Sequence, residues 1–121
     1  ATDLTFGYRS DRLLLNGWSA EFPPDTMTAI LGRSGRGKST LLYLLGLMLR
    51  PSRGSVAIDG LPLSDRPDRD RARYRAAHFG FVFQDAALDP TRSVLDNIVE
   101  AALYRGQPRS DVARPTRLAA W

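Results

Sequence analysis

Short stretches of alternating hydrophobic and polar residues, separated by turn-forming residues, fill the first part of the chain. Residues 4–8 alternate and predict a strand. Residues 18–22 alternate again until Pro23-Pro24 breaks the pattern. Residues 27–31 form an apolar run, which is typical of a strand buried on both faces. The pattern therefore predicts three N-terminal strands.

Helical patterns follow. Residues 38–47 are apolar nearly all round, which predicts a buried helix, and Pro51 and Gly54 lie where it must have ended. Pro67 suits the first position of a polar helix that reaches about Ala77. A last helix is predicted where apolar residues recur at helical spacing, at Val94, Leu95, Ile98, Ala101 and Ala102.

Two further strands are predicted between these helices, over residues 55–58, before the Asp59-Gly60 turn, and over 78–83. Strands that alternate with helices indicate an α/β fold with a parallel sheet. The early strands, joined by turns such as Asn16-Gly17, are expected to form a separate antiparallel flap.

Composition narrows the class of protein. The 121 residues are 43% hydrophobic and 25% charged, with no cysteine, so thiol chemistry and disulfides are excluded. No apolar run approaches the roughly 18 residues of a membrane span, and no signal peptide is evident, so a cytosolic setting is expected. The net charge of +4 comes from scattered arginines mixed with aspartates, most densely over residues 65–75, so nucleic acid is not expected as a partner.

Residues 32–40 carry the most specific motif of the chain, Gly, four residues, then Gly-Lys-Ser, between a predicted strand and a predicted helix. Such a loop cradles phosphates with its backbone N–H groups at the positive end of a helix. Lys38, the single lysine among 17 basic residues, is expected to reach the β- and γ-phosphates, and the Ser39 hydroxyl to hold Mg²⁺. The alternative is a glycine-rich turn with a chance lysine. The predicted nucleotide-binding residues of the loop are Gly32, Ser34, Gly35, Arg36, Gly37, Lys38, Ser39 and Thr40.

Motifs on either side of the loop resemble the ATP-binding cassette (ABC) family. Phe81-Val82-Phe83-Gln84-Asp85 is similar to the family's Q-loop, and the proline, threonine and Val-x-x-Asn that follow over residues 90–98 also match. Phe6-Gly7-Tyr8 is similar to the A-loop. The resemblance reaches about Arg109 and leans toward the lipoprotein-releasing and macrolide-export group.

The resemblance implies a P-loop NTPase fold with a RecA-like parallel sheet core. It divides the chain into an antiparallel flap over residues 1–25, a P-loop core over 26–84, and a Q-loop and the start of a helical subdomain over 85–121. Together these form the N-terminal portion of one ABC nucleotide-binding domain.

Roles also follow from the resemblance. Tyr8 is expected to stack on adenine, and Gln84 to join Ser39 at Mg²⁺ while lying near the attacking water, which makes Lys38 and Gln84 the catalytic candidates. The implied partners are ATP, a transmembrane permease and a second cassette, which places the protein at the inner face of the membrane. For Tyr8 the alternative is an ordinary strand residue without a role in binding, and for Gln84 it is a surface loop residue. His78 does not match the family's switch histidine and is expected at a strand edge.

Several family motifs do not occur in these residues: the signature Leu-Ser-Gly-Gly-Gln, the strand ending in Asp-Glu, the D-loop and the switch histidine. We therefore expect an incomplete cassette that binds MgATP to power export or extraction in its full-length form and is inactive alone. The alternatives are a nucleotide-binding module without hydrolysis and a small-molecule kinase. Two residues depart from the family pattern. Asp25 stands where the family usually has glycine, and Arg36 stands where it usually has a small residue.

Overall fold

The computed structural model describes residues 1–9, 11–83, 88–104 and 106. The chain divides into two compact units, Ala1–Ala72 and Arg73–Trp121. Helix α2 (Asp68–His78) begins in the first unit and ends in the second. Each unit is described by itself.

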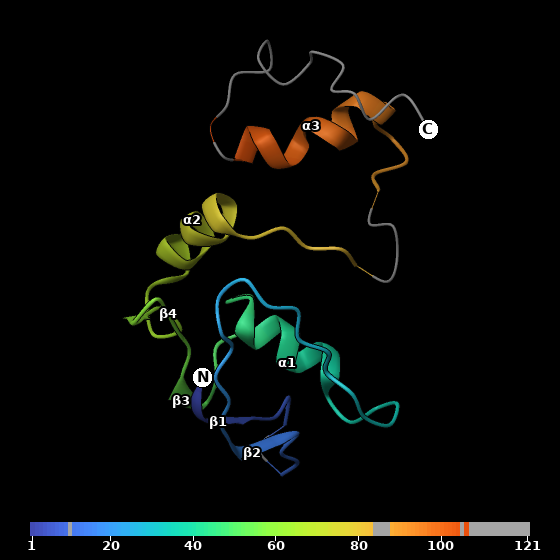
Figure 1. The fold of residues 1–121 in the computed structure, drawn as a ribbon. Coiled ribbons are helices and arrows are strands. Elements are labelled where there is room, and N and C mark those ends of the chain that lie inside the picture. The colour runs from blue at the N-terminus through green and yellow to red at the C-terminus, as the bar shows by residue number, and fades with distance from the viewer. Residues whose placement is uncertain (10, 84–87, 105, 107–121) are drawn as a thin grey trace. The chain divides into compact units, whose positions relative to one another are not determined.

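Three short antiparallel strands form the sheet of the first unit. β1 (Thr2–Phe6) lies between β2 (Leu15–Trp18) and β3 (Arg53–Ser55), as Figure 1 shows. The antiparallel N-terminal pairing predicted from the sequence is confirmed. The second strand was expected over residues 18–22 and instead lies earlier, because the Gly17 N–H bonds to the Thr5 side chain and draws Asn16-Gly17 into the pairing.

A two-stranded hairpin follows, made of β4 (Ala57–Ile58) and β5 (Leu61–Pro62). Asp59 and Gly60 connect them with φ angles of 50° and 76°. Positive φ at both central residues is the geometry that matches the twist of a tight hairpin, so the predicted turn is confirmed.

All three predicted helices are present, as α1 (Lys38–Leu45), α2, and α3 (Val94–Tyr104). Gly46 and Leu47 end α1, and Leu47 takes a φ of 60°. The core of the first unit is formed by apolar side chains from β1, α1 and the β3–β5 region. They are Leu4, Leu41, Leu44, Leu47, Val56 and Leu63, each at most 7% exposed.

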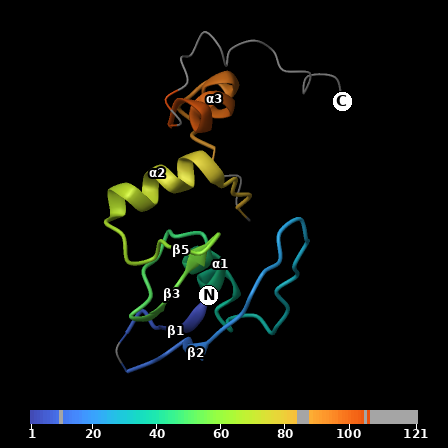
Figure 2. The same ribbon diagram turned by 60° about the vertical axis from the view of Figure 1, so that its left-hand side comes forward.

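Two predicted strands are absent from the structure, so these predictions are corrected. Residues 26–33 form a coil without a strand, drawn in light blue in Figure 2, and Met27 is fully exposed. Residues 79–83 are also coil, although the rings of Phe79, Phe81 and Phe83 stack in sequence at 5.6 and 6.0 Å. A strand needs a hydrogen-bonded neighbour, and neither segment pairs with one among the described residues.

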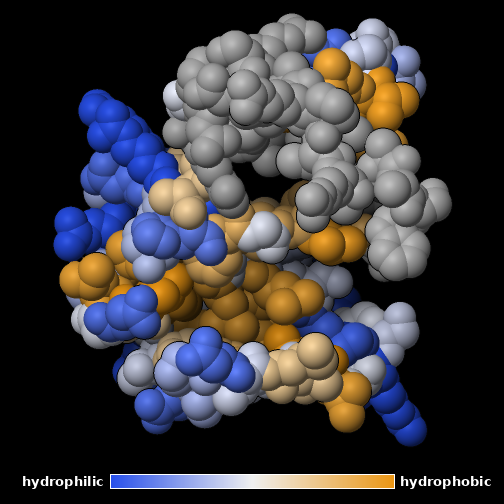
Figure 3. Space-filling view, turned by 45° about the horizontal axis from the view of Figure 1, so that its top comes forward, coloured by the Kyte–Doolittle hydropathy of each residue, from blue (hydrophilic) through white to orange (hydrophobic). Residues whose placement is uncertain are grey.

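The predicted parallel sheet is likewise not confirmed. Every strand pairing within the described residues is antiparallel. The apolar side chains that such a sheet would bury remain exposed, among them Leu31 and Val82. On the face drawn in Figure 3, hydrophobic side chains in orange lie open beside hydrophilic ones in blue.

Candidate functional site

The loop before α1 has the backbone that its glycines predict. Gly35 and Gly37 have φ angles of 74° and 83°, in the left-handed region that glycine adopts without steric cost. Gly37 is also the residue that caps the N-terminus of α1, and its carbonyl accepts the Leu41 N–H at 2.8 Å. The loop therefore turns sharply into the helix at the point where an anion would bind.

The N-terminus of α1 is suited to an anion. No side chain caps its N–H groups, and none of the residues in its first turn is acidic. The unbonded N–H groups and the positive end of the helix dipole therefore face the loop without a competing carboxylate. Ser39 is exposed in this turn, where its hydroxyl can reach a bound ligand.

Lys38 folds back over its own loop. Its ammonium donates hydrogen bonds of 2.9 Å to the carbonyl oxygens of Gly32 and Arg33. An ammonium has three protons, so Lys38 can keep a loop carbonyl while it turns toward a phosphate. The Lys38 side chain thus lies against the carbonyl groups of its own loop.

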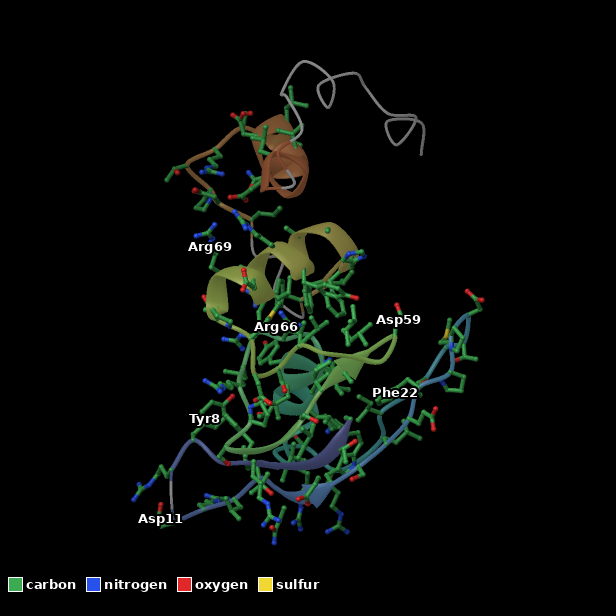
Figure 4. The ribbon with its side chains drawn as sticks, turned by 90° about the vertical axis from the view of Figure 1, so that its left-hand side faces the viewer. Tyr8, Asp11, Phe22, Asp59, Arg66 and Arg69 are labelled. Atoms are coloured by element: carbon green, nitrogen blue, oxygen red, sulfur yellow. The ribbon has the colours of Figure 1, made fainter. Side chains whose placement is uncertain are left out.

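Tyr8 lies beside α1, although 32 positions separate it from Thr40. The two hydroxyls are 3.4 Å apart, and the Phe6 ring meets the Tyr8 ring edge-on at 5.2 Å. Tyr8 remains 65% exposed. Figure 4 shows Tyr8 next to the turn that carries Asp11, at the end of the unit opposite Phe22. The structure therefore brings the predicted base-stacking residue to the loop helix with most of its surface open.

Gln84, predicted at both the catalytic and the metal positions, lies outside the described residues. Residues 89–97 are held together by Asn97, for which the sequence predicted no such role. Asn97 accepts the Asp89 N–H at 2.8 Å and donates to the carbonyls of Asp89 and Ser93. Ser93 in turn caps α3 by accepting the Asp96 N–H, a serine–acid pattern that the sequence alone could have revealed.

The carboxylate of Asp89 is held by two hydrogen bonds from one neighbouring residue. The Thr91 hydroxyl donates to its carboxylate at 2.6 Å, and the Thr91 N–H donates to the same oxygen. These two hydrogen bonds hold the pKa of Asp89 below its ordinary value, with a smaller contribution from the nearby Arg92 charge. Asp89 therefore stays charged and orders the loop before α3.

Metal binding would have to rely on few protein atoms. The part of the chain that the structure describes contains no cluster of three or more histidine, cysteine or acidic side chains. Mg²⁺ bound to nucleotide phosphates needs only one or two protein oxygens, so the Ser39 hydroxyl fits this mode and a protein cage does not. His78 was expected at a strand edge, but it is the exposed last residue of α2, where it stacks on Tyr74 at 4.3 Å.

Comparison with known proteins agrees with this geometry. The ABC transporter family matches residues 15–120, and the chain belongs to that family. It is 43% identical over 106 residues to lipoprotein-releasing system ATP-binding protein LolD 1 of Rhodopirellula baltica, which covers 87% of this chain and 46% of that protein. It is 38% identical to LolD of Geobacter metallireducens, over 95% of this chain and 52% of that protein.

A third relative is the macrolide export ATP-binding/permease protein MacB of Rhodopseudomonas palustris, 43% identical over 88 residues, which are 73% of this chain and 13% of that protein. The chain thus spans about half the length of the LolD relatives that it matches. Among the described residues, no helix has the length and apolar character needed to cross a membrane.

Proposed function

We propose that this chain is the N-terminal portion of an ATP-binding domain that powers an ABC transporter. The observation that carries the proposal is the loop over residues 32–37, with its left-handed glycines and with Lys38 folded over it. Membership of the ABC transporter family supports ATP as the nucleotide. In the full-length protein, residues 27–31 and 79–83 would join the parallel sheet core of the P-loop NTPase fold.

Each predicted residue takes a role in MgATP binding. The backbone of residues 32–37, together with Thr40, surrounds the phosphates, and Lys38 neutralises the β- and γ-phosphates. Ser39 and Gln84 provide oxygen ligands for Mg²⁺, and Tyr8 stacks on adenine. Bound Mg²⁺ would polarise the phosphate that is transferred. The chain's own residues bind, orient and neutralise the triphosphate.

Hydrolysis is proposed for the full-length protein and not for these residues alone. Phosphoryl transfer depends on groups that act together to position water and stabilise charge. A carboxylate pair for that task is not among the residues that we assign to the site. Nucleotide binding without hydrolysis is therefore the alternative function for the chain by itself.

The partners follow from the same proposal. The protein would pair with a second cassette and couple hydrolysis to a membrane permease through residues 84–98, at the inner face of the membrane. The names of the LolD and MacB relatives favour export or extraction as the direction of transport. Residues 89–97 support a coupling role because Asn97 and Asp89 fix this loop to α3.

Isothermal titration with ATP and Mg²⁺ tests binding, and phosphate release by the full-length protein tests hydrolysis. We expect MgATP binding by the chain and phosphate release only by the full-length protein. Failure of the full-length protein to bind ATP would refute the proposal. Phosphate release that requires an added acceptor molecule would indicate a kinase instead.

A further inference from the structure

The hydroxyls of Tyr8 and Thr40 form a long hydrogen bond of 3.4 Å that links the end of β1 to the loop helix. The two ends of this link differ in exposure. Thr40 is 7% exposed, whereas Tyr8 is 65% exposed. The bond therefore anchors the hydroxyl tip of the tyrosine to a buried point of α1 and leaves most of the ring open.

The chain is also crowded at the residue before Tyr8. A Cβ atom added at the preceding residue, Gly7, would collide with the carbonyl oxygen of Arg12, so the chain passes very close to its neighbour there. The Phe6 ring also packs edge-on against the Tyr8 ring, with an interplanar angle of 85°. Tyr8 is thus held by the contact of its ring with Phe6 and by its hydroxyl.

We infer that Thr40 is a positioning residue that orients the Tyr8 ring for the base of a purine nucleoside triphosphate. This inference rests on the proposed function and adds a specific task for the Thr40 side chain. A ring that is already held loses less conformational freedom when a base stacks on it. The hydroxyl bond therefore strengthens binding of the base, whereas the loss of any Thr40 contact with the phosphates would weaken binding of ATP and tripolyphosphate alike.

The test compares two ligands, ATP and inorganic tripolyphosphate, each with Mg²⁺, by isothermal titration of the full-length protein. Only ATP carries a base, so the ratio of the two affinities isolates base binding from phosphate binding. Thr40→Val removes the hydroxyl and keeps the side-chain shape. Thr2→Val makes the same change at an exposed position of β1, outside the proposed site and the proposed sheet core, and serves as the control.

We expect Thr40→Val to lower the ATP-to-tripolyphosphate affinity ratio about 3- to 10-fold, which is the effect of freeing one side chain. Thr40→Ser retains a hydroxyl and should keep the wild-type ratio, and Thr2→Val should leave it unchanged. Tyr8→Phe, which keeps the ring and removes its hydroxyl, should lower the ratio to the same extent. The double variant should show no further loss, because both changes break one bond.

An unchanged ratio in both Thr40→Val and Tyr8→Phe would overturn the inference, as would fully additive losses in the double variant. Tyr8→Phe supplies the result if Thr40→Val does not fold. If the wild-type protein binds ATP and the variants have the same affinity ratio as the wild type, the inference is refuted and the proposed function is not. Wild-type protein that binds neither ligand refutes the proposed function and the inference with it.

Discussion

The Nζ atom of Lys38 lies 2.9 Å from the carbonyl oxygen of Gly32, the first residue of its own loop. A second bond of the same length reaches the carbonyl of Arg33. The ammonium thus bonds two loop carbonyls whose dipoles would otherwise repel an anion. A phosphate can replace these bonds with stronger charge-assisted ones, which is why the only lysine of the chain stands here.

Lys38→Ala should weaken ATP binding by about 10- to 100-fold, because a charge-assisted hydrogen bond contributes roughly 1.5–3 kcal/mol. Isothermal titration of the full-length protein with ATP and Mg²⁺ measures this change. Arg69→Ala removes one exposed positive charge far along the sequence and should leave the affinity unchanged. Equal losses in both variants would mean that net charge, and not the loop contact, governs binding.

Arg36→Ser should leave ATP affinity unchanged or raise it. The Arg36 N–H already bonds to the Arg33 carbonyl at 3.4 Å, and serine preserves that backbone group. The long Arg36 side chain is exposed at the mouth of the loop, where removing it opens the approach to the phosphates. Titration with ATP checks the prediction, with Arg69→Ser as the matched loss of charge. Much weaker binding by Arg36→Ser alone would show that the guanidinium itself contacts the nucleotide.

The sequence predicted the helices and the phosphate loop better than it predicted the sheet. Helix α1 and the loop before it depend on hydrogen bonds between residues at most a few positions apart, so the local pattern suffices. Residues 27–31 have a strand-like pattern, but the hydrogen bonds of a strand come from distant residues. Without a neighbour beside it, this segment remains an exposed coil.

In the candidate site, too, some features follow from the local sequence and others depend on distant residues. Lys38 and the loop glycines follow directly from the motif. The approach of Tyr8 to Thr40 depends on how β1 packs in the first unit, and only the family resemblance indicated it. Asp25 is informative in another way: its φ of 56° is left-handed, so the glycine usual in the family has a clear structural reason at this position.

Arg71→Ala should loosen the C-terminal end of α1. The Arg71 guanidinium is buried, donates to the Leu47 carbonyl at 3.3 Å, and pairs with Asp68 at 2.9 Å. A cation at this end of a helix is favourable, and loss of a hydrogen bond from a charged group costs about 1.5–3 kcal/mol. Amide hydrogen exchange in the full-length protein should therefore become faster at residues 44–49.

The control for this prediction is Arg69→Ala on the same helix, where the side chain is exposed (Figure 4 labels Arg69). Exposed substitutions of this kind usually change stability by less than about 0.5 kcal/mol. Arg71→Lys should give an intermediate result, since lysine keeps the charge but not the planar donor group. Exchange rates that are equal in the two alanine variants would refute a specific role for Arg71.

The loop before α3 should depend on pH through Asp89. Because hydrogen bonds from Thr91 lower the pKa of Asp89 in the folded protein, its contribution to loop order is fully present above the ordinary value of 3.8. The contribution is lost as the pH falls through the lower, folded-state pKa. An NMR titration of the Asp89 carboxyl carbon should therefore have its midpoint below 3.8.

Thr91→Ala removes the hydroxyl that is the largest cause of this shift and keeps the backbone N–H donor. Its titration midpoint should rise toward the ordinary value without fully reaching it, because the Thr91 N–H and the Arg92 charge remain. Thr28→Ala, at an exposed coil position, should leave the midpoint as in the wild type. If Thr91→Ala also titrated like the wild type, the Thr91 N–H or the charge of Arg92, and not the Thr91 hydroxyl, would have to be the main cause of the low pKa of Asp89.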